Sequence, residues 1–257
     1  MKVVILAGGL GTRLSEKTDE IPKPMVEIGG YPILWHIMNI YSSYGFNDFI
    51  IALGYKGYKV KDYFTNYHAR HADLSVDLKT GDVEVFPKNT LDWRITLVDT
   101  GAETMTGGRI KRLATYLDDT FMLTYGDGVS NVNLKELLDY HKKHGKLLTM
   151  TTVHPTSRYG KLEIDVNNQV NSFVEKPEFG GDWINGGFMV VEPEVLQYIK
   201  GDDDVFEREP LEKIASNGEL MAFKHTEFWH CMDTLRDRND LEKLWQSGSA
   251  PWTKLYD

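Results

Sequence analysis

The first half of the chain alternates between short apolar runs and segments whose apolar residues recur at helical spacing. Continuous apolar runs at Lys2–Ala7, Asp48–Leu53 and Phe121–Tyr125 are typical of strands that a parallel sheet buries on both faces. Between the first two runs, residues 31–44 place isoleucine, leucine and tyrosine at helical spacing, and Gly45 follows, which predicts a helix. This alternation indicates an α/β fold with a doubly wound, mostly parallel sheet.

Antiparallel pairs interrupt this pattern. Residues 74–86 alternate apolar and polar side chains around a turn that contains Gly81, which predicts a β-hairpin. Residues 160–164 and 170–175 predict a second antiparallel pair in the second half of the chain. Further helices are predicted at residues 109–117, 134–144 and 235–245. Because neither a low-complexity linker nor an internal repeat separates these parts, we expect one domain with insertions.

The composition is that of an acidic protein without a large basic surface. The 257 residues carry a formal net charge of −9, and 41% of them are hydrophobic. No lysine- and arginine-rich block is present, which argues against binding to nucleic acid or a membrane surface. No apolar run has the length of a membrane span, and the short apolar N-terminus fits a buried strand better than a signal peptide. We therefore expect a cytoplasmic protein.

The cysteine and the histidines do not form a recognisable metal-binding motif in the sequence. Cys231 is the only cysteine, so an intrachain disulfide and a thiol metal cluster are both excluded, and a small buried apolar role is expected. The pairs His68/His71 and His141/His144 share a spacing that can bind a metal on a helix, but no third ligand lies nearby in the sequence. We expect these histidines to be exposed to solvent.

A glycine-rich segment follows the first predicted strand. Glycines at 8, 9 and 11, followed by Thr12 and Arg13, let backbone N–H groups approach phosphates closely. The segment lacks the Gly-Lys-Ser/Thr of a Walker loop, and Leu14 stands where a dinucleotide fingerprint needs glycine. On its own it could be only a tight exit from the strand. Further along, prolines flank Lys23 on both sides and hold it on a stiff segment.

Three further motifs place polar residues next to predicted strands, the first two at a strand end and the third before a strand. They are Gly126-Asp127-Gly128, Glu175-Lys176-Pro177 and Asn185-Gly186-Gly187. Ligands bind at the carboxyl ends of strands in open α/β sheets, although Asp127 could also belong to a simple Asp-Gly turn. A later aspartate, Asp233, precedes the last predicted helix and could serve there as a helix cap.

In this order, the motifs resemble those of the sugar-nucleotide pyrophosphorylases, and the resemblance covers nearly the whole chain. It implies a Rossmann-like nucleotidyltransferase fold over residues 1–257. Residues 1–130 would bind mainly the nucleotide, while residues 131–257 would bind mainly the sugar phosphate and supply a second metal ligand.

The segments 98–101, 105–109, 125–129 and 229–237 are similar to those of members that use CTP. The resemblance then implies transfer of a cytidylyl group from CTP to α-D-glucose 1-phosphate, which yields CDP-glucose and pyrophosphate. In this family, CDP-glucose is associated with dideoxysugars of bacterial surface polysaccharide such as lipopolysaccharide O-antigen. A thymidylyl- or uridylyltransferase remains an alternative. So does a non-catalytic relative, which would be expected to have lost Arg13, Lys23 or Asp127.

The resemblance also assigns roles to residues. The sugar phosphate attacks the α-phosphorus directly, assisted by Mg²⁺, a hard ion that carboxylates and phosphate oxygens bind. Asp127 and Asp233 would hold Mg²⁺, while Arg13 and Lys23 would be the catalytic cations on the phosphates. The implied sugar phosphate contacts are Glu175, Lys176, Asn185 and Gly186. The implied nucleotide contacts are Leu6, Ala7, Gly8, Gly9, Gly11, Thr12, Arg13, Lys23, Thr104, Gly108, Arg109, Asp127 and Gly128.

Within the nucleotide set, Arg109 is expected to present its fork of donors to the base or the phosphates. The alternative for Arg109 is a solvated charge at the start of a helix.

The predicted hairpin at residues 74–86 is too long to serve only as a cover for the core. Members of the family that the chain resembles commonly form homo-oligomers. We therefore expect a symmetric oligomer larger than a dimer, with this hairpin contributing to the interface. The alternative is that the hairpin forms a flap over the active site.

Overall fold

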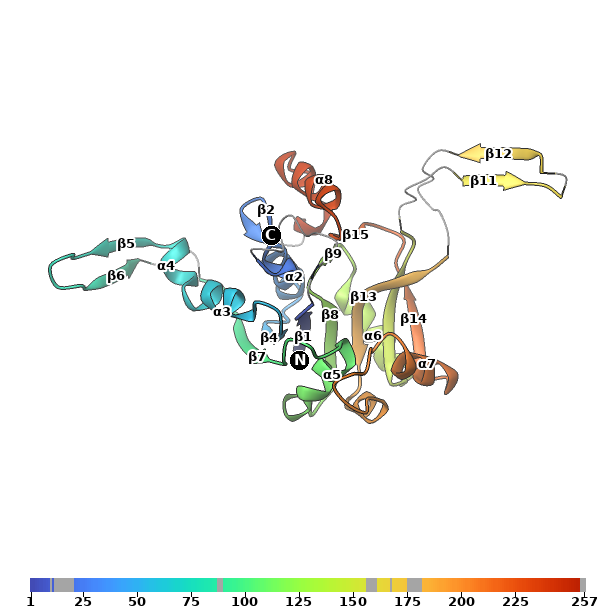
Figure 1. The fold of residues 1–257 in the computed structure, drawn as a ribbon, viewed down its shortest axis with the longest axis horizontal. Helices are drawn as coiled ribbons and strands as arrows, with labels where there is room; N and C mark the ends of the chain where they lie inside the picture. Colours follow the sequence, from blue (N-terminus) through green and yellow to red (C-terminus); the bar gives the residue numbers. More distant parts are fainter. Residues whose placement is uncertain are drawn as a thin grey trace.

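The computed structural model describes residues 1–9, 11, 21–86, 90–155, 161–166, 168–174 and 182–254. A seven-stranded sheet with the order β14-β10-β13-β8-β1-β4-β7 runs through the centre of the protein (Figure 1). Its strands are β1 (Lys2–Ala7), β4 (Asp48–Leu53), β7 (Arg94–Asp99), β8 (Phe121–Tyr125), β10 (Leu148–Val153), β13 (Ile184–Val191) and β14 (Leu220–Lys224). β13 alone pairs antiparallel with both neighbours, β8 and β10. The predicted α/β fold with a mostly parallel sheet is confirmed.

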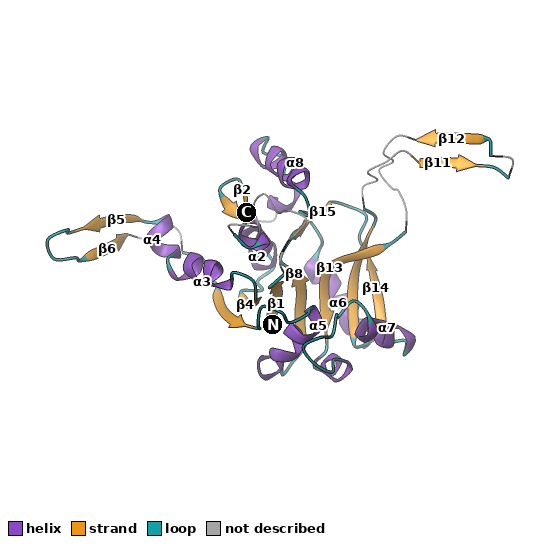
Figure 2. Ribbon diagram, viewed as in Figure 1, coloured by secondary structure: helices purple, strands orange, loops and turns teal. Residues whose placement is uncertain are grey.

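Helices cover both faces of this sheet (Figure 2): α2 (Ile33–Ser42), α3 (Gly57–Thr65), α5 (Thr106–Arg112), α6 (Leu134–His144) and α7 (Glu209–Ser216). α4 (Tyr67–His71) has no buried residue, and α8 (Leu235–Gln246) packs on residues 27–28 outside the sheet. Short 3₁₀ turns are η2 (Lys23–Met25), η3 (Ala114–Tyr116), η4 (Pro193–Tyr198) and η5 (Pro251–Thr253). Side chains alternate between the two faces of a strand. Val3 and Ile5 accordingly pack in one core with α2 and α6, while Val4 and Leu6 pack in the other with α5 and α7.

Local signals explain where the main helices begin and end. The side chain of Asn133 accepts hydrogen bonds from the N–H groups of Lys135 and Glu136 at the start of α6, and Gly145 ends that helix with φ +63°. Thr234 caps α8 in a reciprocal capping box with Asp237. The helix predicted at 109–117 instead begins at Thr106, so Gly107 and Gly108 lie inside it.

The prediction that the histidines are exposed is wrong for His141. This side chain is 1% exposed, its Nδ1 lies 2.8 Å from Thr149 Oγ1, and its Nε2 lies 2.9 Å from Glu192 Oε1. His141 therefore anchors α6 to the sheet through polar contacts that an apolar pattern could not indicate.

Two hairpins extend away from the body of the protein (Figure 1). They are formed by β5 (Asp73–Val76) with β6 (Val83–Phe86), and by β11 (Lys161–Ile164) with β12 (Val170–Val174). All eight residues of β5 and β6 are exposed. Two short pairs complete the structure: β2 (Glu27–Ile28) with β3 (Tyr31–Pro32), and β9 (Gly128–Ser130) with β15 (Trp229–Cys231).

Candidate active site

The carboxyl ends of β1 and β8 lie side by side, because the two strands are parallel neighbours. Gly8 and Gly9 follow β1, and Gly126 follows β8, where its N–H donates to Leu6 O at 3.0 Å. These ends open into a pocket of about 310 Å³, which we call the first pocket. Its lining residues are Leu6, Ala7, Gly8, Gly9, Gly11, Lys23, Pro24, Thr104, Met105, Thr106, Arg109, Tyr125, Gly126 and Asp127.

A second pocket of about 260 Å³ adjoins the first and shares Tyr125 and Asp127 with it. Its lining residues are Thr124, Tyr125, Asp127, Gly128, Asn185, Gly186, Phe188, Trp229, Cys231 and Asp233. The structure thus brings together nine predicted nucleotide contacts in the first pocket and both Asn185 and Gly186 in the second. Thr12, Arg13, Glu175 and Lys176 lie outside the described residues.

Lys23 bridges the two aspartates of the predicted metal site. Its Nζ lies 2.7 Å from Asp127 Oδ2 and 2.7 Å from Asp233 Oδ1. Burial lowers the pKa of Lys23, but the charge of Asp127 and the hydrogen bonds to both carboxylates outweigh this effect and raise it. The ammonium group therefore stays charged at the boundary between the pockets.

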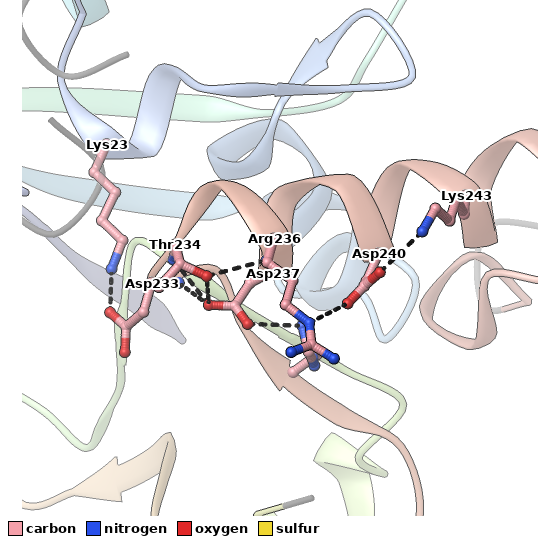
Figure 3. A network of polar contacts seen from close by, with 8 residues as sticks. Lys23, Asp233, Thr234, Arg236, Asp237, Asp240 and Lys243 are labelled. Carbon is pink, nitrogen blue, oxygen red and sulfur yellow. Dashed lines mark hydrogen bonds and ion pairs between the residues drawn. The ribbon is translucent and has the colours of Figure 1, made fainter. Parts of the chain in front are cut away.

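Asp233 reaches this position through a strand pairing between distant segments. β15 pairs with β9, and the Met232 N–H donates to Asp127 O at 2.8 Å, which places Asp233 beside Asp127. The cap of α8 is Thr234, and Asp237 Oδ2 accepts from the N–H groups of both Asp233 and Thr234 (Figure 3). The alternative that Asp233 is only a helix cap is therefore wrong.

Cys231 lies in the same cluster, a position that the sequence did not indicate. Asp127, Cys231 and Asp233 each offer one possible ligand atom, and these three atoms lie within 4.8 Å of one another. The paired carboxylates fit a hard cation such as Mg²⁺, whereas a thiol suits softer metals. Burial and the nearby carboxylates raise the pKa of Cys231, so its thiol stays protonated beside them.

Arg109 is a buried residue that holds the loops around the first pocket. It is 4% exposed, and its guanidinium donates to four carbonyls and one hydroxyl at 2.7–3.2 Å. The acceptors are Gly8 O, Leu53 O, Thr100 Oγ1, Gly101 O and Ala102 O. Burial, followed by the charge of Arg112, lowers the pKa of Arg109. The alternative of a solvated charge at a helix start is wrong, and protein atoms occupy the donors that we expected to face a base.

Two of the predicted nucleotide contacts, Gly8 and Gly108, lie where a side chain would clash with neighbouring atoms. A Cβ on Gly8 would lie 2.3 Å from atoms of the Arg109 guanidinium, and a Cβ on Gly108 would lie 2.5 Å from Asp202 Cα. Gly108 lines neither pocket, and Gly128 lines the second pocket instead of the first. At positions 8 and 108, glycine allows this close approach whether or not a ligand contacts it.

Sequence reasoning also missed Glu207 and Trp229. Trp229 Nε1 donates to Gly186 O at 2.7 Å and fixes one wall of the second pocket. Glu207 accepts hydrogen bonds from Thr106 and Tyr125. Glu207 belongs to none of the motifs singled out, whereas Trp229 opens the segment 229–237, to which no contact role was assigned at that position.

The structure contains no helix that is long and apolar enough to cross a membrane within the ranges that it describes.

Comparison with known proteins points to one family. The family model described as "Nucleotidyl transferase" matches residues 2–234. Glucose-1-phosphate cytidylyltransferase of Salmonella typhi is 54% identical over 254 residues, which cover 98% of each chain. The probable glucose-1-phosphate cytidylyltransferase of Bacillus subtilis is 45% identical over 254 residues, which cover 98% of this chain and 99% of the relative.

Solved structures share the fold. HddC from Yersinia pseudotuberculosis superposes with a TM-score of 0.69 at 27% identity, over 95% of this chain and 99% of the other. A UDP-glucose pyrophosphorylase complexed with UDP-glucose has a TM-score of 0.69 at 17% identity, over 96% of this chain and 98% of the other. At that identity, the second comparison supports the fold alone.

Proposed function

Since the chain belongs to the nucleotidyl transferase family, we propose that it transfers a cytidylyl group from CTP to α-D-glucose 1-phosphate, releasing CDP-glucose and pyrophosphate. The protein is an enzyme, a nucleotidyltransferase; the nucleotide and the sugar are the proposal. The observation that carries this choice is the similarity, along nearly the whole chain, to proteins named glucose-1-phosphate cytidylyltransferase.

The adjoining pockets suit direct transfer between two bound substrates. We assign the nucleotide to the first pocket and the sugar phosphate to the second, so that the reacting groups meet near Tyr125 and Asp127, which line both. A phosphate oxygen of the sugar phosphate attacks the α-phosphorus, and pyrophosphate leaves. Because that oxygen is already ionised, the reaction needs no general base, and catalysis consists of positioning and charge neutralisation.

Lys23 is the described cation that this mechanism uses. Held at 2.7 Å from each of two carboxylates, its ammonium stands where the phosphates of the two substrates would approach each other, and it draws them together. We assign the charge on the triphosphate to Arg13 and the sugar phosphate to Lys176, both outside the described residues.

Asp127 and Asp233 are the residues that we expect to hold Mg²⁺, since their carboxylates converge from the two halves of the chain. When bound, Mg²⁺ would supply positive charge that stabilises the phosphate oxygens. The division of binding roles between residues 1–130 and 131–257 stays a prediction.

Pyrophosphate release tests the proposal directly. The protein is incubated with glucose 1-phosphate, Mg²⁺ and each of CTP, UTP, dTTP, GTP and ATP in turn, and kcat/KM is compared. We expect CTP to lead clearly, because a site built on hydrogen bonds leaves buried polar groups unpaired with the wrong base. Equal use of UTP or dTTP would overturn the cytidylyl assignment and leave the family assignment intact. No release with any nucleotide would indicate a non-catalytic member.

A further inference from the structure

Glu207 connects the two pockets through a continuous chain of hydrogen bonds. Its Oε2 accepts from Thr106 Oγ1 at 2.6 Å, and its Oε1 accepts from Tyr125 OH at 2.7 Å. Tyr125 OH in turn accepts from Asn185 Nδ2 at 3.0 Å. Thr106 lines the first pocket, Asn185 the second and Tyr125 both. We call these four side chains the cross-pocket network.

The direction of each bond in the network is fixed. A carboxylate only accepts, so Tyr125 must donate to Glu207 and present an oxygen lone pair to Asn185. On the other side of the amide, the Gly187 N–H donates to Asn185 Oδ1 at 2.9 Å. The Asn185 amide can therefore take only one of its two orientations.

The opposite end of the network is anchored to the backbone. Thr106 Oγ1 accepts from the Phe206 N–H at 2.9 Å while its own hydroxyl donates to Glu207. The Gly107 N–H donates to Asp204 O at 2.8 Å. The loop that carries Glu207 is thus tied to the first turn of α5, which holds the Glu207 carboxylate in place although its residue is solvent-exposed.

We propose that Tyr125 and Glu207 are positioning residues that hold Asn185 as a hydrogen-bond donor toward the sugar phosphate. The inference rests on the proposed function, because it takes the second pocket as the site of the sugar. Among the residues that the structure describes, no protein atom accepts the second Nδ2 hydrogen of Asn185. That hydrogen is available to a sugar oxygen, and the Tyr125 contact excludes the flipped amide, which would present an acceptor instead.

Three variants test the network, with one matched control. Tyr125→Phe keeps the ring and removes the hydroxyl. Glu207→Ala removes the acceptor, whereas Glu207→Gln keeps an oxygen that can accept from Tyr125. Glu209→Gln is the control, because this carboxylate stands two positions on and instead pairs with Lys200 and Lys213.

Equilibrium binding measurements distinguish effects on the first pocket from effects on the second without relying on turnover. Calorimetry gives Kd for CTP, which would fill the first pocket, and for CDP-glucose, which would fill both. We expect Tyr125→Phe and Glu207→Ala to weaken CDP-glucose about tenfold, the loss typical of one well-placed hydrogen bond, and CTP less than about twofold. Glu207→Gln should lose less than Glu207→Ala. Because the residues act through one amide, the double variant Tyr125→Phe/Glu207→Ala should be no weaker than Tyr125→Phe.

The inference is overturned if the variants bind CDP-glucose as wild type does, or if CTP and CDP-glucose weaken equally, which would indicate a purely structural role. In both cases wild-type binding and turnover leave the proposed function standing. If the wild-type protein binds CTP but not CDP-glucose, the proposed function fails and the inference fails with it.

Discussion

Lys23, Asp127 and Asp233 form the ion cluster on which the proposed chemistry depends. Two carboxylates and one ammonium carry a local net charge of −1, and the Lys23 side chain is 12% exposed. Electrostatic interactions at such a partly buried position are screened less by water and salt than those at the surface. Small changes of charge here should therefore have large effects on turnover.

We expect Asp233→Asn to lower kcat at saturating Mg²⁺ by about 10³-fold, the loss typical when a charge partner of the transition state is removed. The fold should survive, because Thr234 and Asp237 still cap α8. Steady-state kinetics and circular dichroism check both statements. Asp240→Asn is the control on the same helix, where Asp240 pairs with Lys243. Near-normal turnover of Asp233→Asn would show that Asp233 is not a ligand of the catalytic metal.

Arg109 should contribute to the stability of the fold more than to nucleotide binding, because protein atoms accept its hydrogen bonds. Arg109→Ala removes a donor from the Thr100 hydroxyl and the Gly101 carbonyl, while the Gly8 and Leu53 carbonyls keep hydrogen bonds from Tyr55 and Thr100. Each orphaned acceptor costs about 1–3 kcal/mol, and truncation of the buried side chain adds the cost of a cavity. We expect a loss of at least about 3 kcal/mol in the free energy of unfolding, which lowers Tm by roughly 6–12 °C in a chain of this size. Arg112→Ala, at a more exposed arginine that pairs with Asp202, is the control. An unchanged Tm with weaker CTP binding would support the base-contact role that the sequence predicted.

His36 should make the stability depend on pH. It is fully buried, its Nε2 lies 2.9 Å from Ile28 O, and Trp252 Nε1 donates to its Nδ1 at 3.3 Å. Burial lowers the pKa of His36 to about 4. Between about pH 6.5, the unfolded value, and about pH 4, the unfolded chain binds a proton that the folded chain does not. The contribution of His36 is therefore complete above about pH 6.5 and is lost as pH falls toward 4, by about 3 kcal/mol in total.

Urea unfolding of wild type and His36→Gln at pH 7.5 and pH 4.5 isolates this effect. Glutamine does not titrate, so the variant should lose less unfolding free energy on acidification than wild type does. Equal losses would show that other groups dominate the acid response.

The residue roles that the sequence could indicate were those set by local motifs. Lys23 between two prolines and Asp127 between two glycines stand out, and the structure brings both to the pocket edge. Glu207 and His141 could not be recognised, because their partners come from distant elements: Tyr125 for the first, and Thr149 and Glu192 for the second.

At the level of elements, a bulge in β13 shapes the second pocket. Met150 pairs with Met189, and Thr152 pairs with Asn185, so β13 has two more residues in this interval than β10. Gly187 and Phe188 have φ of +73° and +44°, a left-handed conformation that is uncommon for phenylalanine. Phe188 remains buried and stacks on Tyr41 with ring centroids 5.8 Å apart, which helps to hold it there.

Gly187→Ala should disturb the second pocket through this bulge. The new Cβ would adopt a strained φ and lie 3.2 Å from Tyr125 Cδ2, next to the Asn185 contact. We expect a loss of about 1 kcal/mol in stability from backbone strain, together with a higher KM for glucose 1-phosphate. Gly218→Ala is the matched control: Gly218 has φ +71° with nothing within 4 Å of the new Cβ. The two variants should be similar in unfolding free energy and different in KM; equal KM values would contradict the prediction.

The sequence predicted the buried strands well, but it predicted the start of α5 and the β9–β15 pairing poorly. β1, β4 and β8 match their apolar runs, because burial on both faces leaves little room for polar residues. The start of α5 was predicted three residues late, since two glycines resemble a helix stop. In the structure they lie in the helix, where Asp202 and Asp204 cross too closely for a Cβ. The β9–β15 pairing that carries Asp233 to the site has no local signal at all.

At the scale of the molecule, the β5–β6 hairpin exposes large apolar side chains that a single chain does not cover. Leu74, Val76, Val83 and Phe86 are 43–56% exposed, and an isolated two-stranded hairpin is marginally stable in water. The hairpin contributes no residue to either pocket. These observations favour an interface between copies over a flap, and a symmetric oligomer larger than a dimer stays our prediction.

Light scattering at micromolar protein should give a mass above that of a dimer. Val76→Lys/Val83→Lys, which places charges on the hairpin, should lower that mass, because buried charges without partners are costly. Tyr116→Lys, at a 38% exposed tyrosine on the body, should leave it unchanged. A monomeric wild type would overturn the oligomer prediction.

The two hairpins that stand off the body (Figure 1) also determine how the chain moves through solvent. Thin projections add frictional drag out of proportion to their mass, so a single copy should elute from a sizing column as if it were heavier. If the copies assemble through the β5–β6 hairpins, these projections are covered as mass is added while the β11–β12 hairpins still project, and the frictional ratio in sedimentation velocity should fall below that of a single copy. The shape measurement thus reports on the hairpins independently of the mass.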